Sequence, residues 1–175
     1  LYEKKSDNDN HLTNRAHEYV FIGKKRDELK NLKALKDIAA ILTDKAECRL
    51  IGSLGLNLSY PQVLDTVPSD IDLFANNTIS NIKKIINQMK KMNMTIYSWQ
   101  DIIDDDFDFE LLKGRYYIRG IKDDIKVDVS YEIGNLNYSD MESCGIQTDN
   151  IKTYNKYGFI KLLECSERKE NKEQL

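Results

Sequence analysis

Two short segments of the sequence alternate between apolar and polar residues, and this alternation limits the folds open to the chain. Residues 70–75 (DIDLFA) and 125–131 (IKVDVSY) both place an apolar side chain at every second position. A period of two is typical of a β-strand that buries one face and exposes a polar face. We therefore expect a sheet with one face packed under other elements and with carboxylates on the opposite face.

Other segments repeat apolar residues at spacings of three and four, which is typical of amphipathic helices that could cover such a sheet. The predicted helices are residues 26–44, 79–92 and 157–175. Further strands are predicted at residues 48–51, 94–99 and 115–121, the last joined to 125–131 by a tight turn at 122–124. Residues 134–153 show no clear period and are expected to be irregular. The order of elements predicts an α+β fold: a mixed sheet with flanking helices and a C-terminal helical segment.

The charge and cysteine content exclude several classes of protein. The 175 residues carry 26 Lys and Arg against 29 Asp and Glu, so the strong basic excess of a nucleic-acid-binding protein is missing. No apolar run reaches the length of a membrane span. Three scattered cysteines without a CxxC pair, and only two histidines, argue against a zinc site and for free thiols. We expect a cytoplasmic protein without a membrane or nucleic-acid partner.

The strand predicted at residues 48–51 runs directly into Gly52 and Ser53. Glycine lets a backbone turn sharply and approach a ligand closely. If a helix starts at this point, its first N–H groups point at an anion such as a phosphate, and the Ser53 hydroxyl adds a donor. By itself a Gly-Ser pair at a strand end is more often a simple turn, so this interpretation depends on what accompanies it.

Three aspartates accompany it. Asp70 and Asp72 are two apart on one predicted strand, so their carboxylates share a face, where they repel one another unless a cation lies between them. Asp128 lies on the polar face of another strand. Oxygen ligands of this kind suit Mg²⁺ or Mn²⁺, and three carboxylates suffice for a site that promotes phosphoryl displacement. The alternative for each aspartate alone is a solvated strand face.

The Gly-Ser pair, the two aspartates Asp70 and Asp72, and the later Asp128 follow one another along the chain. In this order they resemble the motifs of the DNA polymerase beta superfamily of nucleotidyltransferases. The matching residues are Leu50–Ser53, Ser69–Phe74 and Lys126–Val129, within a resemblance that covers about residues 26–131. The resemblance implies that Mg²⁺ (or Mn²⁺) and a nucleoside triphosphate such as ATP bind here. It implies that the first two aspartates bind metal and that the third binds metal and activates the acceptor.

The final predicted helix, with Lys161 and residues 166–170, looks like the closing helix of antibiotic-modifying and abortive-infection nucleotidyltransferases, although a solvated charged helix end is the favoured interpretation. One departure concerns the spacer, because sixteen residues separate Ser53 from Asp70. A long spacer is similar to that of the LicD-type phosphotransferases, which move a phospho-alcohol from a CDP-linked donor. Against LicD, Ser69 stands where an aromatic residue and a further aspartate would be expected.

The sequence therefore predicts a metal-dependent transferase that moves a nucleoside monophosphate from a nucleoside triphosphate to a hydroxyl acceptor, a small molecule or a protein. Its catalytic and metal-binding residues are expected to be Asp70, Asp72 and Asp128, and its phosphate-binding residues Gly52 and Ser53. LicD-like transfer and a non-catalytic regulatory or antitoxin module with the same fold remain open alternatives.

We expect three parts: a mobile arm at residues 1–14, the nucleotidyltransferase-like domain at 15–140 and a C-terminal helical segment at 141–175. Because the sequence begins with Leu1 and its helical pattern still runs at Leu175, we expect an excerpt of a longer chain.

Further polar residues surround the third aspartate in the sequence. Arg115, Arg119 and Lys126 lie near Asp128, and one of them is expected to pair with a triphosphate. Arg115 and Arg119 share one face of their predicted strand. Three nearby tyrosines are expected to serve in packing; they are Tyr116, Tyr117 and Tyr131. The acidic run at residues 104–110 is expected to be a solvated loop.

Overall fold

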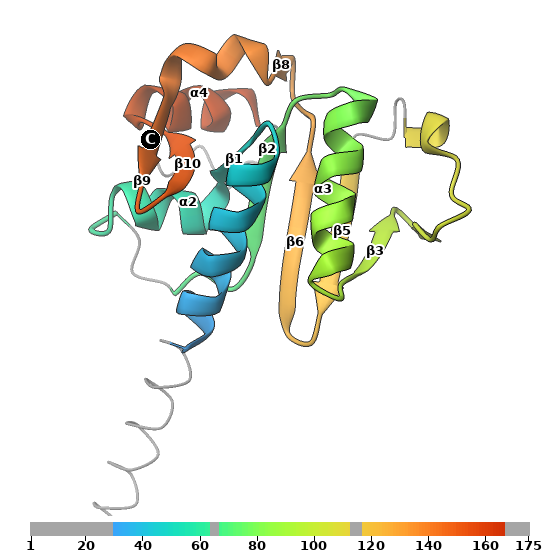
Figure 1. Ribbon diagram of the computed structural model, residues 1–175. Helices are drawn as coiled ribbons and strands as arrows, with labels where there is room; N and C mark the ends of the chain where they lie inside the picture. The colour runs from blue at the N-terminus through green and yellow to red at the C-terminus, as the bar shows by residue number, and fades with distance from the viewer. Residues whose placement is uncertain (1–29, 64–66, 113–116, 167–175) are drawn as a thin grey trace, which may run out of the picture.

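The computed structural model describes residues 30–63, 67–112 and 117–166 (Figure 1). The arm predicted at residues 1–14 lies outside these ranges, as do Arg115, Tyr116 and everything after Ser166. Within them the chain is an α+β protein with a six-stranded mixed sheet and flanking helices, so the predicted fold class is confirmed.

The sheet has the strand order β1-β2-β6-β5-β3-β4. Its strands are β1 (Cys48–Ile51), β2 (Ile71–Ala75), β3 (Thr95–Ser98), β4 (Asp101–Ile102), β5 (Tyr117–Lys122) and β6 (Ile125–Ser130). The central pair β2–β6 is parallel, and every other neighbouring pair is antiparallel. The hairpin predicted around residues 122–124 is confirmed as β5–β6.

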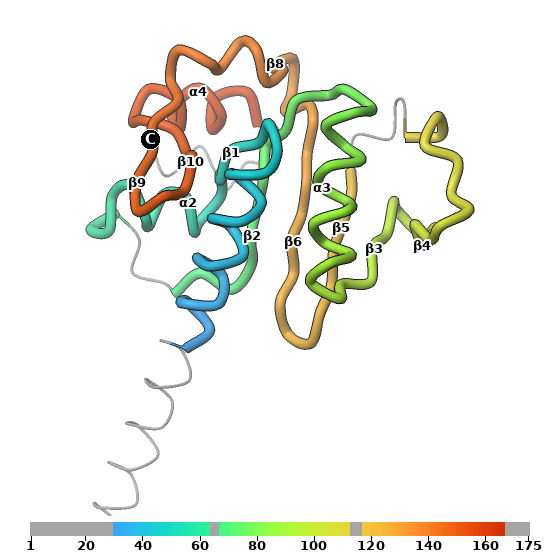
Figure 2. Tube along the Cα trace, viewed as in Figure 1, coloured from blue at the N-terminus to red at the C-terminus, as the bar shows by residue number. Residues whose placement is uncertain are grey.

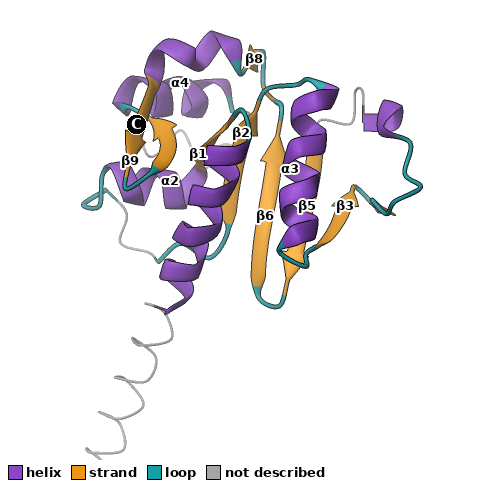
Figure 3. Ribbon diagram, in the orientation of Figure 1, coloured by secondary structure: helices purple, strands orange, loops and turns teal. Residues whose placement is uncertain are grey.

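One face of the sheet is buried, as the alternation predicts. The first helix, described over residues 30–45, and helix α3 (Ile79–Lys91) lie against the same side of the strands (Figure 3). Their apolar side chains and those of alternate strand positions form one core, which includes Leu42, Ile85, Leu73, Val127 and Ile118. Burial of this face directs the intervening residues of the strands to the opposite face.

The buried Asn81 on α3 fixes the far ends of β1 and β2. Its side chain accepts a hydrogen bond from the Glu47 N–H at 2.7 Å and donates to the Glu47 and Asn76 carbonyls, both at 3.0 Å. Helix α3 begins after Thr78, whose side chain accepts a hydrogen bond from the Asn81 N–H. Because buried backbone groups need partners, this side chain holds the two strands that carry the site in one register.

The segment expected to be irregular, residues 134–153, contains strands, and that prediction was wrong. It includes β8 (Leu136–Asn137), paired with β7 (Glu132–Ile133), and the hairpin β9 (Gly145–Thr148) and β10 (Ile151–Tyr154), with the 3₁₀ helix η2 (Ser139–Cys144) between the two pairs. Figure 2 shows β10 beside β1, and the Thr153 hydroxyl donates to the Leu50 carbonyl at 2.8 Å. Strands of two to four residues are too short to show a period, and packing of β10 on β1 stabilises the β9–β10 hairpin.

A second, smaller core lies on the other face of the sheet, over β1 and β2 only. Phe74 of β2 packs there with residues of η2, β10 and helix α4 (Lys156–Cys165), namely Met141, Tyr154, Phe159 and Leu162. The C-terminal segment is therefore helical only in part. The helix predicted to reach Leu175 ends at Cys165, because Ser166 is extended. This arrangement leaves the polar face of β6, β5 and β3 uncovered by the second core.

Candidate active site

One row of residues crosses the polar face of the sheet from strand to strand. The paired positions, read across β1, β2, β6, β5 and β3, are Ile51, Asp72, Asp128, Arg119 and Tyr97. Residues paired in this way point to the same side of a sheet, and neighbouring strands are about 4.8 Å apart. Two of the three predicted aspartates, Asp72 and Asp128, are therefore direct neighbours on the parallel strands.

Asp70 belongs to the same group but not to the strand. The strand predicted to begin at residue 70 begins at Ile71 instead. Asp70 directly precedes this strand and is half-buried. Hydrogen bonding to Asp128 is the main cause that raises the pKa of the Arg119 guanidinium, and the negative charge of Asp70 adds to it. Arg119 therefore lies within electrostatic reach of both the first and the third aspartate.

The Gly-Ser pair forms the corner beside Asp72. Helix α2 (Gly52–Ser59) begins directly after β1, which meets the condition that the phosphate interpretation set, and its N-cap residue Ile51 makes no side-chain hydrogen bond to the first turn. Gly52 has a φ of +63°, and a Cβ atom at this position would overlap the Asp72 carboxylate. Only glycine meets both conditions without strain. The corner thus joins the first N–H groups of a helix, the half-buried Ser53 and a carboxylate.

Asp128 is held by two neighbours on β5. The Arg119 Nε donates to Oδ1 at 2.6 Å and its Nη2 donates to Oδ2 at 2.8 Å, while the Tyr117 hydroxyl donates to Oδ1 at 2.7 Å. Both carboxylate oxygens therefore accept short, charge-assisted bonds. The Asp128 side chain is 16% exposed and that of Arg119 40%, so the pair stands at the surface of the polar face rather than in the core.

These contacts set the protonation states. Burial alone would raise the pKa of Asp128, but the hydrogen bonds from Arg119 and Tyr117 outweigh it and hold that pKa below its usual range. Burial, together with the hydrogen bond to Asp128, raises the pKa of the Tyr117 hydroxyl. At neutral pH, Asp128 is therefore a carboxylate and Tyr117 a neutral donor.

Sequence reasoning missed these two roles. Tyr117 was expected to serve in packing, and Arg119 was one of three basic residues expected to offer a partner for a triphosphate; the hydrogen bonds that both donate to Asp128 were not expected. The predicted hairpin could have indicated both contacts. A register that pairs Lys122 with Ile125 also pairs Arg119 with Asp128 and places Tyr117 diagonally across from Asp128. Arg115 lies outside the described residues. Tyr131 is buried in the main core, as expected.

A stability measurement can check the Arg119–Asp128 pair. The pKa of Asp128 is lower in the folded than in the unfolded chain, so the pair stabilises the fold above the ordinary carboxyl range. That contribution should be lost as the pH falls through the folded pKa. At pH 7 we expect Asp128→Asn to lower the free energy of unfolding by about 1–2 kcal/mol.

Urea unfolding of both proteins between pH 7 and pH 3 measures this gap, which should close toward the acid end. Asp105→Asn is the matched control, because its ion pair with Lys90 is fully exposed on the Asp105 side and should contribute little at any pH. A gap that stays constant down to pH 3 would contradict the assignment.

The donor groups available for a metal ion are limited in the described part of the chain. Among residues 30–63, 67–112 and 117–166, no group of three or more His, Cys, Asp or Glu side chains is arranged to hold a metal ion. At this site the Arg119 guanidinium binds both oxygens of Asp128. The chemistry of the three carboxylates suits Mg²⁺ or Mn²⁺, and Arg119 competes with a metal ion for the oxygens of Asp128.

Comparison with known proteins leaves the family open. No protein-family model matches the chain, and no curated protein matches it. Among solved structures, the crystal structure of JHP933 from Helicobacter pylori matches with 17% sequence identity and a TM-score of 0.44, over 78% of this chain and 56% of that one. The chain thus spans little more than half the length of that protein. The described part of the chain contains no helix long and apolar enough to cross a membrane.

Proposed function

We propose that this protein is a metal-dependent nucleotidyltransferase, which moves a nucleoside monophosphate from a nucleoside triphosphate to a hydroxyl acceptor. The observation that carries the proposal is the pairing of Asp72 with Asp128 on adjacent parallel strands, beside a helix that begins at Gly52. A transferase of this kind needs a cradle for the donor phosphates and carboxylates next to it. The motif resemblance supports the same interpretation.

Each residue has a definite role in this proposal. The first N–H groups of α2 and the Ser53 hydroxyl bind the β- and γ-phosphates of the donor. Asp70 and Asp72 would hold Mg²⁺ or Mn²⁺, which when bound neutralises charge on the phosphates. Asp128 orients the acceptor hydroxyl and accepts its proton. Its low pKa keeps it in the ionised form that this role requires.

Arg119 gives the proposal a specific requirement. While Arg119 and Tyr117 donate to Asp128, Oδ1 accepts two hydrogen bonds and Oδ2 accepts one, so a substrate hydroxyl must compete for what remains of Oδ2. We propose that Arg119 exchanges at least one of these bonds for a phosphate oxygen of the donor, a partner it binds equally well. Tyr117 then keeps Asp128 in position through Oδ1. Donor binding would in this way free the residue that activates the acceptor.

The same contacts favour a second candidate, a non-catalytic module with this fold. A site that no longer binds metal or substrate would be expected to neutralise its third carboxylate with a fixed cation, and Arg119 does this for Asp128. The two candidates differ in a simple respect. The enzyme requires metal-dependent binding of a nucleotide, whereas the non-catalytic module needs none.

Calorimetry with the four ribonucleoside triphosphates, with and without Mg²⁺, tests the proposal. We expect Mg²⁺-dependent binding of at least one of them, and its loss in the double variant Asp70→Asn/Asp72→Asn. Asp104→Asn/Asp106→Asn is the matched control, because it removes the same charge from an exposed loop. Binding that persists unchanged in the site variant would refute the assignment. Turnover of CDP-choline alone would replace it by the LicD-like alternative.

We also propose that the protein works in the cytoplasm. Cys48, Cys144 and Cys165 are free thiols, as expected in a reducing compartment. Burial raises the pKa of the Cys48 thiol to about 12, so this group is an inert part of the core.

A further inference from the structure

A single buried hydroxyl connects the hairpin β9–β10 to the phosphate corner, by which we mean Gly52, Ser53 and the first turn of α2. Thr153 of β10 is fully buried, and its Oγ1 donates a hydrogen bond to the Leu50 carbonyl at 2.8 Å. Thr153 and Leu50 are 103 positions apart in the sequence, and Leu50 lies two residues before Gly52. This hydrogen bond therefore joins a distant hairpin to the backbone from which α2 starts.

The burial of residue 153 makes its identity informative. Valine has nearly the same shape as threonine, and both β-branched side chains suit a strand. A buried hydroxyl costs free energy unless it is hydrogen-bonded, so threonine is favourable at this position because of its bond to Leu50. The bond also gives a partner to a carbonyl of β1, a strand at the edge of the sheet. Thr153 thus controls the backbone of that edge strand.

The same carbonyl oxygen contacts helix α2. A Cβ atom added at Gly55 would lie 2.9 Å from the Leu50 oxygen, so the backbone of the helix packs directly against it. The N-cap residue Ile51 gives the first turn no side-chain hydrogen bond, so the direction of the helix depends on its surroundings. Thr153, Leu50 and Gly55 therefore bring β10, β1 and α2 together at one oxygen atom.

We infer that Thr153 is a positioning residue for the phosphate corner, because its hold on the Leu50 carbonyl fixes the point and direction at which α2 begins. The inference rests on the proposed function, in which the first N–H groups of α2 bind the donor phosphates. A displacement of these groups by about 1 Å is enough to weaken such a site. Thr153 is fully buried and acts through Leu50 rather than on the donor itself.

Thr153→Val removes the hydrogen bond with little change of shape, whereas Thr153→Ser keeps the hydroxyl. Amide hydrogen exchange, without metal or nucleotide, compares the N–H groups of α2 with those of α3, which reports on the main core. The ratio of the two exchange rates within one protein cancels a uniform loss of stability. We expect Thr153→Val to raise the exchange of α2 relative to α3 by about tenfold, and Thr153→Ser to restore the ratio.

Calorimetry of the same proteins with Mg²⁺ and the bound triphosphate reads the consequence for the site. We expect the dissociation constant of the donor to rise by about tenfold in Thr153→Val and to return toward the wild-type value in Thr153→Ser, as for a residue that orients a binding group from behind.

Thr43→Val is the matched control. Thr43 is equally buried, and its hydroxyl accepts a hydrogen bond from the Lys152 N–H of the same strand β10 at 3.3 Å. The other hydrogen bond of this hydroxyl goes to the Ala40 carbonyl, so neither of them reaches β1. Thr43→Val should therefore destabilise the packing of the hairpin without a selective change in α2 and without a change in donor affinity.

Selective exchange in α2 together with weaker donor binding in Thr153→Val, both restored in Thr153→Ser, would support the inference. Equal loosening of α2 and α3, an unchanged donor affinity in Thr153→Val, or the same selective effect in Thr43→Val would overturn it. Failure of the proposed function is a separate result, because it appears as a wild-type protein that binds no triphosphate. In that case the exchange of α2, measured without nucleotide, still decides whether Thr153 fixes the start of the helix.

Discussion

Asp128→Asn is expected to lower nucleotidyl transfer by about 10²–10⁴-fold while leaving the dissociation constant of the donor nearly unchanged. Asparagine has the shape of aspartate and still offers an oxygen to Tyr117 or Arg119, so the strand geometry should survive. It cannot accept the proton of the acceptor hydroxyl. In the proposed function the donor phosphates are held at Gly52 and Ser53, on the other side of β2 from Asp128. Turnover and calorimetry on the same preparations measure the two quantities separately.

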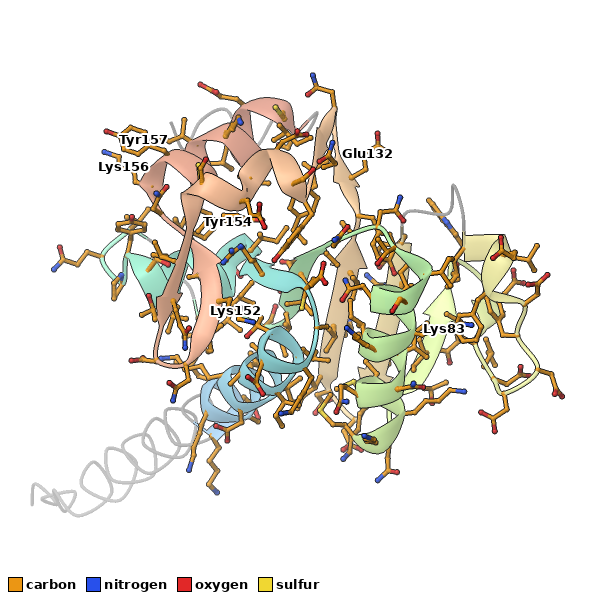
Figure 4. All side chains as sticks on the ribbon, turned by 45° about the horizontal axis from the view of Figure 1, so that its top comes forward. Lys83, Glu132, Lys152, Tyr154, Lys156 and Tyr157 are labelled. Atoms are coloured by element: carbon orange, nitrogen blue, oxygen red, sulfur yellow. The ribbon has the colours of Figure 1, made fainter. Side chains whose placement is uncertain are left out.

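The comparison variant for this experiment is Ser53→Ala, which should show the opposite pattern. Loss of one hydrogen bond to a charged group weakens donor binding by about 1–2 kcal/mol with little further effect on turnover of the bound complex. Asp124→Asn, in the exposed β5–β6 turn, controls for the loss of a negative charge. If Asp128→Asn retains full turnover, the proton acceptor must lie elsewhere. Glu132 would be examined first, an exposed carboxylate on β7 (Figure 4).

The sequence predicts those parts of the site that depend on local patterns of apolar and polar residues. Alternation identified β2 and β6 because each buries one face, and the same alternation assigned Asp72 and Asp128 to the polar face. The turn between β5 and β6 was also recognisable, since its polar residues interrupt two apolar runs. Each of these features depends on a few consecutive residues and on which of them are buried. The order of apolar and polar residues is enough to predict both.

The remaining part depends on contacts between distant segments. Nothing local specifies that β2 pairs with β6 in parallel, across more than fifty residues, in the register that sets Asp72 beside Asp128. The hairpin β9–β10 forms because it packs on β1, not because its four-residue strands have a strong pattern. The two hydrogen bonds from Arg119 to Asp128 follow from the register of the β5–β6 hairpin. That register was predictable from the turn, but the ion pair it creates was not predicted.

Gly52→Ala is the second change for which we expect a large effect, because the residue has two separate reasons to be glycine. Its φ of +63° lies in the left-handed region, where a Cβ costs about 1–2 kcal/mol. The new methyl group would also overlap the Asp72 carboxylate, so that side chain or the start of α2 must move. We expect the free energy of unfolding to fall by about 2–4 kcal/mol and donor affinity to fall at least about tenfold, because the phosphate corner loses its geometry. Urea unfolding and calorimetry measure the two losses.

Two further variants separate local strain from damage to the site. Gly134→Ala, in the β7–β8 turn, is the matched control, since Gly134 also has a positive φ of +58° and a Cβ there would meet the Cys165 carbonyl. It should destabilise the fold but leave the donor affinity of the folded protein unchanged. In the double variant Gly52→Ala/Asp72→Ala the overlap is removed, so stability should recover in part, with a favourable coupling between the two positions, while metal-dependent donor binding stays lost. If Gly52→Ala and Gly134→Ala reduce stability equally and both bind the donor normally, then the close approach of Gly52 to Asp72 serves only the fold, and the phosphates must be bound elsewhere.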